Sequence, residues 1–329
     1  MADWAERIPG IKALLESRFD RVDVAYKTVN NQPIETAILI PKSLAPDSTS
    51  VPVLVDIHGG ALVMGANPEP GFIARWAIDL VEQEQAIWVC PSYRLLPEST
   101  SGEILDDIDD FWKWVHHPAS VSSGLQAAVN TVRPGLTLNL YRVALRGESA
   151  GGFLSLQTAF LYPHSKVKVV IAHFPIMYTD LEHDPLPARS KDVPPGSDAD
   201  KLIDKYLEEV AKKPGQIRTV SPWPEMGEFL FATFGTGRLK SLTGDDERMT
   251  LRYAMSRAKS LPPLWVAQGI QDPIVAKEAT DEVVAKIREA YPDTPLKYTV
   301  EDGEHGLGAD LAITDSWVAE GVAFVKKYW

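Results

Sequence analysis

The sequence predicts an α/β fold in which a mostly parallel sheet of eight strands is flanked by helices and carries a helical cap. Two observations predict this fold. Strand-like and helix-like segments alternate along most of the 329 residues, and alternation with short connections is typical of a parallel sheet covered on both faces. Residues 178–260 break the alternation with a proline-rich stretch of their own, which indicates an inserted cap.

The strand-like segments differ in their patterns. Residues 22–29 and 34–40 alternate apolar and polar side chains, which favours an antiparallel hairpin at one edge of the sheet. Residues 51–57 are almost continuously apolar and therefore predict a buried central strand. The other strand-like segments are residues 86–90, 141–145, 166–174, 263–268 and 296–300.

Helix-like segments lie before the sheet and between its strands. In residues 104–115 the apolar side chains recur at helical spacing, which predicts an amphipathic helix. The other helix-like segments of the core are residues 11–19, 72–83, 150–162, 276–291 and 315–328.

Residues 178–260 contain two helix-like segments, 202–210 and 248–258, and a group of aromatic side chains. An insertion of this kind between two strands is expected to act as a lid over one end of the sheet, because enzyme sites need apolar pockets that exclude water. A platform for protein interaction is the alternative. The aromatic residues are Trp223, Phe229, Phe231 and Phe234.

These patterns divide the chain into four parts. Residues 1–20 form an N-terminal helix that we expect to join the cap. Residues 21–177 form the first part of the core, residues 178–260 form the cap, and residues 261–329 complete the core.

Charge and cysteine content exclude several classes of function. The chain has 33 basic and 45 acidic side chains and a net charge of −12, which disfavours binding to nucleic acid or to anionic lipid. Its one cysteine, Cys90, excludes an intramolecular disulfide and a thiol-rich zinc site. With no secretory signal and no apolar run of the ~18 residues that span a bilayer, we expect a soluble, cytoplasmic protein. The sequence is also compatible with a homodimer.

Residues 147–151, Gly-Glu-Ser-Ala-Gly, match the pattern G-x-S-x-G. The match lies between a predicted strand that ends near Leu145 and a predicted helix that begins near Ala150. In this setting the chain turns sharply and holds the serine in strained backbone geometry at the start of a helix. The sequence therefore predicts Ser149 as a nucleophile, with a chance match in a structural loop as the alternative.

A second motif, His-Gly-Gly-Ala at residues 58–61, follows the predicted strand 51–57. Small residues there allow backbone N–H groups to point into a cavity without obstruction. We predict that the N–H groups of Ala150, Gly60 and either Gly59 or Ala61 form an oxyanion hole. A Gly-Gly turn without this role is the alternative, and His58 is expected to organise the loop rather than to act as a base.

Three sequence blocks together resemble a known family. Residues 58–65 (HGGALVMG), 93–98 (YRLLPE) and 147–151 (GESAG) are similar to the three blocks of the hormone-sensitive lipase-like α/β-hydrolases. The resemblance extends from about Val22 to the C-terminus. It implies the α/β-hydrolase fold with a cap over the serine, and the activity of a carboxylesterase, a lipase or a related acyl hydrolase.

The sequence departs from the family pattern at three positions. Ala61 replaces the third glycine of the oxyanion loop, which keeps the N–H group but adds a methyl group. Glu148 replaces the usual aspartate, and Ser92 stands where many members have aspartate.

A serine nucleophile needs an imidazole to take its proton and a carboxylate to orient that imidazole. In this fold the chain order is serine, acid, histidine. His305 is the only histidine after residue 183, so it is the predicted base unless the cap supplies His183.

The acid of the predicted catalytic triad is Asp272, which follows the strand-like segment 263–268. Glu301 and Asp302 compete with it, but they lie on the same loop as His305 and fit the geometry less well. The resemblance supports the same choice, because the sequences around Asp272 and His305 resemble the family's acid and histidine motifs.

These residues predict a serine hydrolase that cleaves carboxylic esters through an acyl-enzyme, without a cofactor or metal, on small to medium apolar substrates. Lactonase, amidase, acyl-transfer or cyclising activity on the same triad, or a non-catalytic ligand-binding receptor, are the alternatives. The residues expected to line the substrate pocket are Leu62, Met64, Glu148, Trp223 and Phe229.

Overall fold

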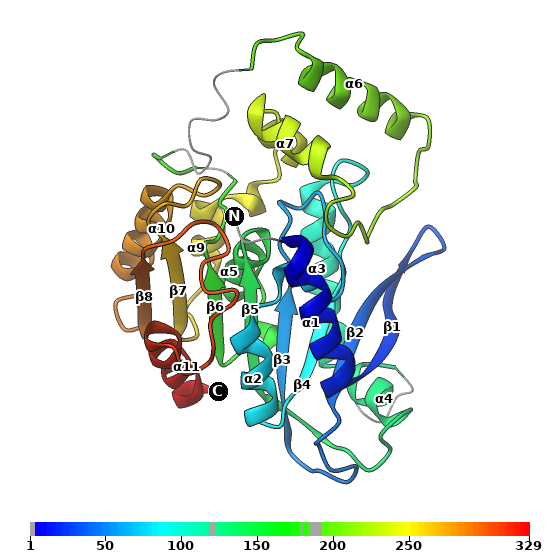
Figure 1. Ribbon diagram of the computed structural model, residues 1–329, viewed down its shortest axis with the longest axis vertical. Coiled ribbons are helices and arrows are strands. Elements are labelled where there is room, and N and C mark those ends of the chain that lie inside the picture. Colours follow the sequence, from blue (N-terminus) through cyan, green and yellow to red (C-terminus); the bar gives the residue numbers. More distant parts are fainter. Residues whose placement is uncertain (1–3, 119–122, 179, 184–192) are drawn as a thin grey trace.

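The computed structural model describes residues 4–118, 123–178, 180–183 and 193–329. Eight strands form one sheet at the centre of the molecule, in the order β1-β2-β4-β3-β5-β6-β7-β8 (Figure 1). The strands are β1 (Phe19–Val29), β2 (Gln32–Pro41), β3 (Val51–Ile57), β4 (Ile87–Pro91), β5 (Leu138–Glu148), β6 (Val169–His173), β7 (Leu264–Gly269) and β8 (Leu296–Glu301).

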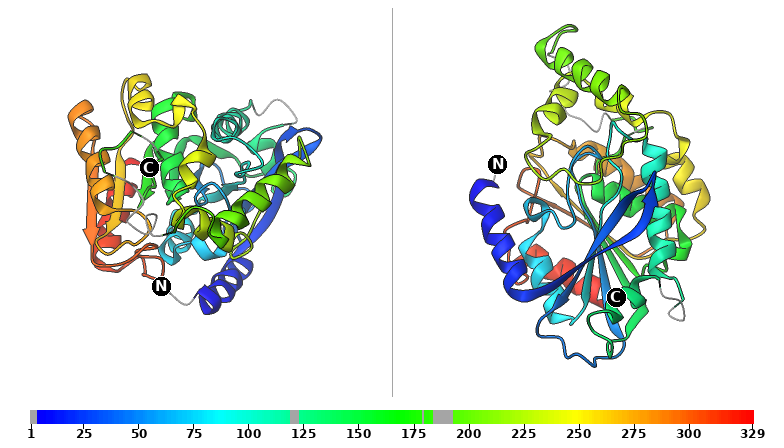
Figure 2. Two further views of the ribbon diagram at one scale, coloured as in Figure 1. Left: turned by 90° about the horizontal axis from the view of Figure 1, so that it is seen from above. Right: turned by 90° about the vertical axis from the view of Figure 1, so that its right-hand side faces the viewer.

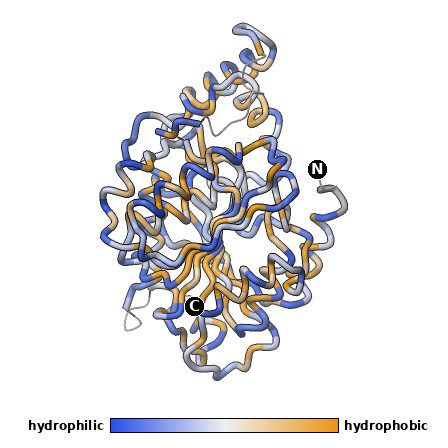
Figure 3. Tube along the Cα trace, turned by 90° about the vertical axis from the view of Figure 1, so that its left-hand side faces the viewer, coloured by the Kyte–Doolittle hydropathy of each residue, from blue (hydrophilic) through white to orange (hydrophobic). Residues whose placement is uncertain are grey.

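The strand directions confirm the predicted sheet. β1 and β2 form an antiparallel pair at one edge, β2 is antiparallel to β4, and the pairs from β4 through β8 are parallel. β3 and β4 are buried along their whole length, as expected for strands covered on both faces. Figure 3 shows hydrophobic residues gathered along the strands in the middle of the molecule.

Helices cover both faces of this sheet. On one face, α2 (Arg75–Gln83) and α11 (Ser316–Tyr328) share a core cluster with Leu54, Trp88 and Trp265 of the strands. The helices on the opposite face are α3 (Ser101–Val115), α4 (Leu125–Asn130), α5 (Ala150–Leu161) and α10 (Lys277–Ala290).

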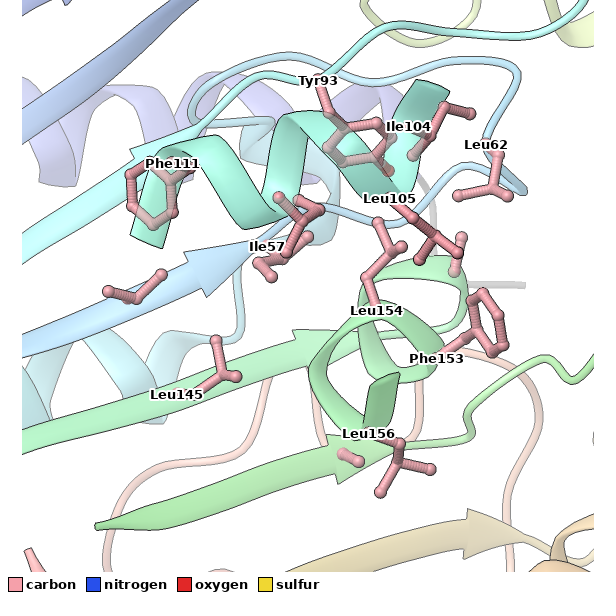
Figure 4. Packing of buried hydrophobic residues seen from close by; sticks show 14 of the residues in the cluster. Ile57, Leu62, Tyr93, Ile104, Leu105, Phe111, Leu145, Phe153, Leu154 and Leu156 are labelled. Carbon is pink, nitrogen blue, oxygen red and sulfur yellow. The ribbon is translucent and has the colours of Figure 1, made fainter. Parts of the chain in front are cut away.

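Helix α3 illustrates why these segments are helical. Thr100 and Glu103 form a capping box that satisfies backbone N–H groups at its first turn. Its apolar side chains, spaced as the sequence predicted, are buried against α5 and the neighbouring strands. Figure 4 shows Leu105 of α3 beside Leu154 of α5, with Phe111 at the other end of α3.

The N-terminal helix α1 (Trp4–Arg18) lies elsewhere than expected. It packs against the core, where Ile11 and Leu15 join the cluster of α2 and α11, and it lies apart from the helices above the sheet (Figure 1). The expectation that residues 1–20 join the cap thus differs from the structure. The physical reason is that α1 ends where the edge strand β1 begins, so the apolar side chains of α1 lie close to the core and are buried there.

The segment between β6 and β7 contains α6 (Asp198–Ala211), α7 (Gly227–Gly235), α8 (Leu239–Thr243) and α9 (Leu251–Arg257). α6 and α7 pack on each other and lie beyond the carboxyl ends of the central strands (Figures 1 and 2). α9, in contrast, packs against α5 of the core. Part of the predicted cap, residues 184–192, lies outside the described residues. Among the helices that are described, none has the length and apolar character needed to cross a membrane.

Candidate active site

Ser149 lies between β5 and α5, at a sharp turn. Its backbone φ and ψ are 54° and −118°, an unusual conformation for a residue other than glycine that costs on the order of 1–3 kcal/mol. The turn is held against β6, because the N–H group of Ser149 donates to the carbonyl oxygen of His173 at 3.0 Å. The predicted strand-turn-helix setting is thus the one that the structure has.

Asp272 and His305 lie on the loops that follow the adjacent parallel strands β7 and β8. Nδ1 of His305 is 2.8 Å from Oδ2 of Asp272. The other carboxylate oxygen of Asp272 accepts the backbone N–H groups of Ile274 at 2.8 Å and Val275 at 2.9 Å. Gln268 donates its side-chain amide to Oδ2 at 3.1 Å. The carboxylate is therefore fixed in orientation and holds one ring nitrogen of His305.

The environment of Asp272 favours its charged form. Burial alone would raise the pKa of this carboxyl, but the charge and hydrogen bond of His305 and the two backbone N–H donors outweigh burial and lower the pKa. Asp272 can therefore remain an acceptor for the His305 ring.

The residues that compete for these roles lie elsewhere. Asp302 accepts a hydrogen bond from the side chain of Gln271 at 3.1 Å and is exposed. Nδ1 of His183 lies 3.1 Å from Oε2 of Glu282 on α10. Of the competing acidic side chains, Asp272 is therefore the one that contacts the His305 ring.

The predicted oxyanion loop, residues 58–65, follows β3 and lies directly beside the turn at Ser149, because Ile57 of β3 is paired with Gly147 of β5. A Cβ atom added to Gly59 would come within 2.9 Å of the backbone oxygen of Glu148, so only glycine allows this approach. The carbonyl oxygen of Gly60 accepts the N–H groups of Val63 and Met64 at 2.9 and 3.0 Å, which closes the loop into a compact turn.

His58 lies behind this loop. Its Nδ1 atom is 2.8 Å from the carbonyl oxygen of Gly59, and its ring stacks on Tyr93 at a centroid distance of 4.3 Å. Burial lowers the pKa of His58 to about 4. The ring is therefore neutral near pH 7. Its contacts with Gly59 and Tyr93 hold the loop in place, which is the role expected from its position in the sequence.

A cavity of about 260 Å³ joins these elements. Most of its walls are apolar, and Ser149, His305 and the oxyanion loop open into it. The lining residues are Gly59, Gly60, Ala61, Met64, Phe72, Glu148, Ser149, Phe174, Trp223, Leu230, Phe231, Phe234, Pro273, Ile274, Glu304, His305 and Gly306. Ala150, the buried first residue of α5, follows the lining residue Ser149 in the chain but is not among the lining residues.

Three of the five expected pocket residues, Met64, Glu148 and Trp223, line this cavity. Leu62 and Phe229 are not among its lining residues. Leu62 has a positive φ of 63° and is fully buried in the core, and Phe229 packs on Tyr206 of α6 with ring centroids 4.7 Å apart. Both residues lie next to a lining residue in the chain, but their side chains are packed elsewhere.

Residue patterns in the sequence did not identify Phe72 and Phe174, the aromatic lining residues of the core. Phe174 directly follows β6, and side chains at the carboxyl ends of parallel strands gather at one edge of the sheet. That rule could have identified Phe174. Phe72 ends a short 3-10 helix, Pro70–Phe72, and nothing in its local sequence places it near the serine.

A buried group of charges lies at the end of β5, next to Ser149. Arg146 pairs with Glu148 and donates from Nη1 to both oxygens of Asp56 at 2.9 and 2.7 Å, and its guanidinium lies 5.3 Å from the ring centroid of Trp76. Burial raises the pKa of Glu148 although Arg146 acts in the opposite direction. Among the described residues, no group of His, Cys, Asp or Glu could hold a metal ion.

Comparisons with known proteins agree with this geometry. A family model described as alpha/beta hydrolase fold matches residues 54–305. The chain is 29% identical to the probable carboxylesterase M8 of Phoma sp. over 318 residues, which cover 94% of this chain and 97% of that protein. It is 32% identical to the probable carboxylesterase clz11 of Cochliobolus lunatus over 196 residues, which cover 58% of this chain and 86% of that protein.

Solved structures show the same fold at low sequence identity. A hyperthermophilic esterase from the archaeon Pyrobaculum calidifontis is similar with a TM-score of 0.59 and 17% identity, over 98% of this chain and 92% of that one. The eight-stranded sheet and the three sequence blocks agree with the family match, which spans more than half of the chain. The protein therefore belongs to the alpha/beta hydrolase fold family and to its hormone-sensitive lipase-like members.

Proposed function

We propose that this protein is a serine carboxylesterase in which Ser149 is the nucleophile, His305 the base and Asp272 the residue that orients the base. One observation carries the proposal: Ser149 and His305 line a single cavity, and Asp272 holds Nδ1 of His305 at 2.8 Å. The relatives named as probable carboxylesterases support ester bonds as the substrate class.

The proposed reaction has two halves. In the first, Oγ of Ser149 bonds to the ester carbonyl carbon while Nε2 of His305 takes the hydroxyl proton. The carbonyl oxygen becomes an oxyanion, which accepts hydrogen bonds from N–H groups of the Gly59–Ala61 loop and Ala150. When the oxyanion collapses, the bond to the alcohol oxygen breaks, and the alcohol leaves with the proton from His305.

The second half returns the enzyme to its starting state. His305 takes a proton from water, whose oxygen bonds to the acyl carbon of the acyl-enzyme. The bond to Oγ of Ser149 then breaks, Ser149 regains a proton from His305, and the carboxylic acid is released. Asp272 stabilises the imidazolium that forms in both halves, because its carboxylate faces Nδ1.

The cavity favours small to medium neutral substrates with apolar groups. Its walls are mainly aromatic and aliphatic, and its volume is about 260 Å³. The acidic residues on its walls are Glu148 and Glu304, and no lysine or arginine is among the described lining residues. An acyl group that carries a negative charge would therefore meet two carboxylates without a cation to pair with.

Labelling with a fluorophosphonate probe tests the nucleophile. We expect the folded protein to be labelled and Ser149→Ala to remain unlabelled. A series of nitrophenyl esters from acetate to decanoate, with a lactone and an anilide as comparison substrates, then measures the substrate class. Folded protein that reacts with neither the probe nor any of the esters would refute the proposed function.

A further inference from the structure

The segment between α6 and α7 crosses the oxyanion loop. Ser221 of this segment and Gly65 at the end of the loop form an antiparallel bridge. The N–H group of Ser221 donates to the carbonyl oxygen of Gly65 at 2.8 Å, and the N–H group of Gly65 donates to that of Ser221 at 2.7 Å. The cap is thus joined by backbone hydrogen bonds to the loop that borders the serine.

Arg218, three residues before this bridge, ties the same segment to two loops of the core. Its Nη1 atom donates to the carbonyl oxygen of Val63 at 2.6 Å, and its Nη2 atom donates to the carbonyl oxygen of Leu96 at 2.5 Å. Glu98 accepts from Nε at 3.0 Å and from Nη2 at 2.9 Å. The Arg218 side chain is only 16% exposed, so these bonds are largely shielded from water.

The two core loops that Arg218 contacts, at Val63 and at Leu96, are also hydrogen-bonded to each other. The N–H group of Leu96 donates to the carbonyl oxygen of Leu62 at 2.8 Å, and the N–H group of Leu95 donates to that of Arg218 at 2.7 Å. The carbonyl groups of Leu62 and Val63, which follow the predicted oxyanion donors, are therefore both fixed by bonds from outside the oxyanion loop.

The loop needs such external bonds. Ala61 and Leu62 both have left-handed backbone conformations, with φ of 55° and 63°, and residues other than glycine adopt this region at an energetic cost. Consecutive residues in this region persist only where the surrounding structure imposes the conformation. Arg218 supplies part of that constraint through Val63.

We propose that Arg218 is a positioning residue of the oxyanion hole, which acts on the donors of the Gly59–Ala61 loop through the carbonyl groups that it holds. This inference rests on the proposed esterase function. Arginine suits the role because its planar guanidinium donates in several directions at once, which a lysine ammonium at the end of a flexible chain does not reproduce.

The same contacts connect the oxyanion loop to the wall of the cavity. The hydroxyl of Tyr206 on α6 donates to Oε1 of Glu98 at 2.6 Å, and the ring of Tyr206 packs on Phe229 of α7. The helix that carries the lining residues Leu230 and Phe231 is thus linked through Tyr206, Glu98 and Arg218 to the loop beside Ser149.

The test compares Arg218→Gln and Arg218→Lys with a matched control, Arg238→Gln. Arg238 is also an arginine of the inserted segment with acidic partners, Asp200 at 3.3 Å and Asp204 at 2.7 Å, but those partners lie on α6. Each variant is measured for kcat and KM on a nitrophenyl ester, for the affinity of a trifluoromethyl ketone that forms a tetrahedral adduct with the serine, and for Tm.

We expect Arg218→Gln to lower kcat by about 10- to 100-fold, as misplaced catalytic groups do, with KM changed less than about threefold. The affinity for the trifluoromethyl ketone should fall by the same factor as kcat/KM, because adduct and transition state use the same oxyanion donors. Arg218→Lys should lie between Arg218→Gln and the wild type, and Arg238→Gln should keep wild-type kinetics.

Provided that the wild type hydrolyses esters, either of two results would overturn the inference. One is a wild-type kcat in folded Arg218→Gln, and the other is a lowered kcat in this variant with unchanged affinity for the ketone. If Arg218→Gln does not fold, Glu98→Gln serves instead, because it loosens Arg218 without removing it. A smaller loss of kcat and of ketone affinity is then expected, and wild-type values of both would overturn the inference. Failure of the wild type to hydrolyse any ester would instead refute the proposed function.

Discussion

Nδ1 of His305 lies 2.8 Å from Oδ2 of Asp272, although the two residues are 33 positions apart in the chain. They meet because the parallel strands β7 and β8 are neighbours, with Gly269 paired with Glu301 near the carboxyl ends of both strands. The loops that follow these strands therefore emerge side by side. In the proposed mechanism, Nε2 of His305 is then the ring nitrogen that exchanges a proton with Ser149.

This relationship predicts the effect of Asp272→Asn. The amide keeps the size of the side chain but loses the charge that stabilises the imidazolium, so kcat should fall by about 10⁴-fold. The matched control is Asp302→Asn, which changes an exposed carboxylate on the loop of His305 and should leave kcat unchanged. Steady-state kinetics on one nitrophenyl ester distinguish the two variants, and the reverse pattern would contradict the assignment of the acid.

Much of the fold follows from residue patterns. Each strand of the sheet has a recognisable apolar or alternating pattern, and Ser149, Asp272 and His305 follow β5, β7 and β8, whose carboxyl ends lie at one edge of the sheet. The positions of these residues can be predicted because the carboxyl ends of parallel strands lie at the same edge of the sheet, whatever the conformation of the loops.

The pocket was less predictable, because its walls depend on backbone geometry that local sequence does not encode. The left-handed conformation at Leu62 turns this side chain into the core rather than into the cavity. α7 has the sequence GEFLFATFG, whose glycines and aromatic residues do not favour a helix, so the orientation of Phe229 toward α6 was not foreseen. Residue patterns also gave no sign of the Asp56–Arg146–Glu148 charge group.

At two adjacent positions of the predicted oxyanion loop, we expect substitutions to differ in their effect on kcat. Gly60 has a φ of +97°, and a Cβ atom added there would lie 2.1 Å from the backbone oxygen of Met64. Gly60→Ala must therefore move the loop, and we expect kcat to fall by about 10²-fold or more. Ala61→Gly keeps the N–H group and relieves a left-handed alanine, so kcat should stay within about threefold of the wild type. Kinetics and Tm of both variants test this contrast, which a wild-type kcat in Gly60→Ala would contradict.

The orientation of α7 predicts different roles for two of its phenylalanines. Phe231 lines the cavity and is 47% exposed, whereas Phe229 is 3% exposed and packs on Tyr206. Phe231→Ala should raise KM for the longer nitrophenyl esters by about 5- to 30-fold, because it removes about 1–2 kcal/mol of apolar contact with substrate, and should change Tm little. Phe229→Ala should instead lower the stability by about 3–5 kcal/mol. Equal effects of both variants on KM would contradict this description of the helix.

Glu282 on α10 predicts a stability effect that depends on pH. Its carboxylate accepts the backbone N–H groups of Glu182 at 2.9 Å and His183 at 3.1 Å, where the chain leads from β6 toward α6. Burial acts to raise the pKa of Glu282, but these N–H donors and the His183 side chain outweigh burial and lower the pKa from 4.5 to about 2. A lowered pKa in the folded state stabilises the fold above pH 4.5, and this contribution is lost as the pH falls toward 2.

Glu282→Gln should therefore be less stable than the wild type at pH 7, and the difference should shrink between pH 4.5 and 2 because the wild-type carboxylate becomes protonated there. Urea unfolding of both proteins at pH 7, 5, 4 and 3 measures this difference in the free energy of unfolding. Glu289→Gln removes an exposed carboxylate of the same helix and should change the free energy of unfolding little at any of these pH values. A difference between wild type and Glu282→Gln that stays constant from pH 7 to pH 3 would show that the charge of Glu282 does not stabilise this connection.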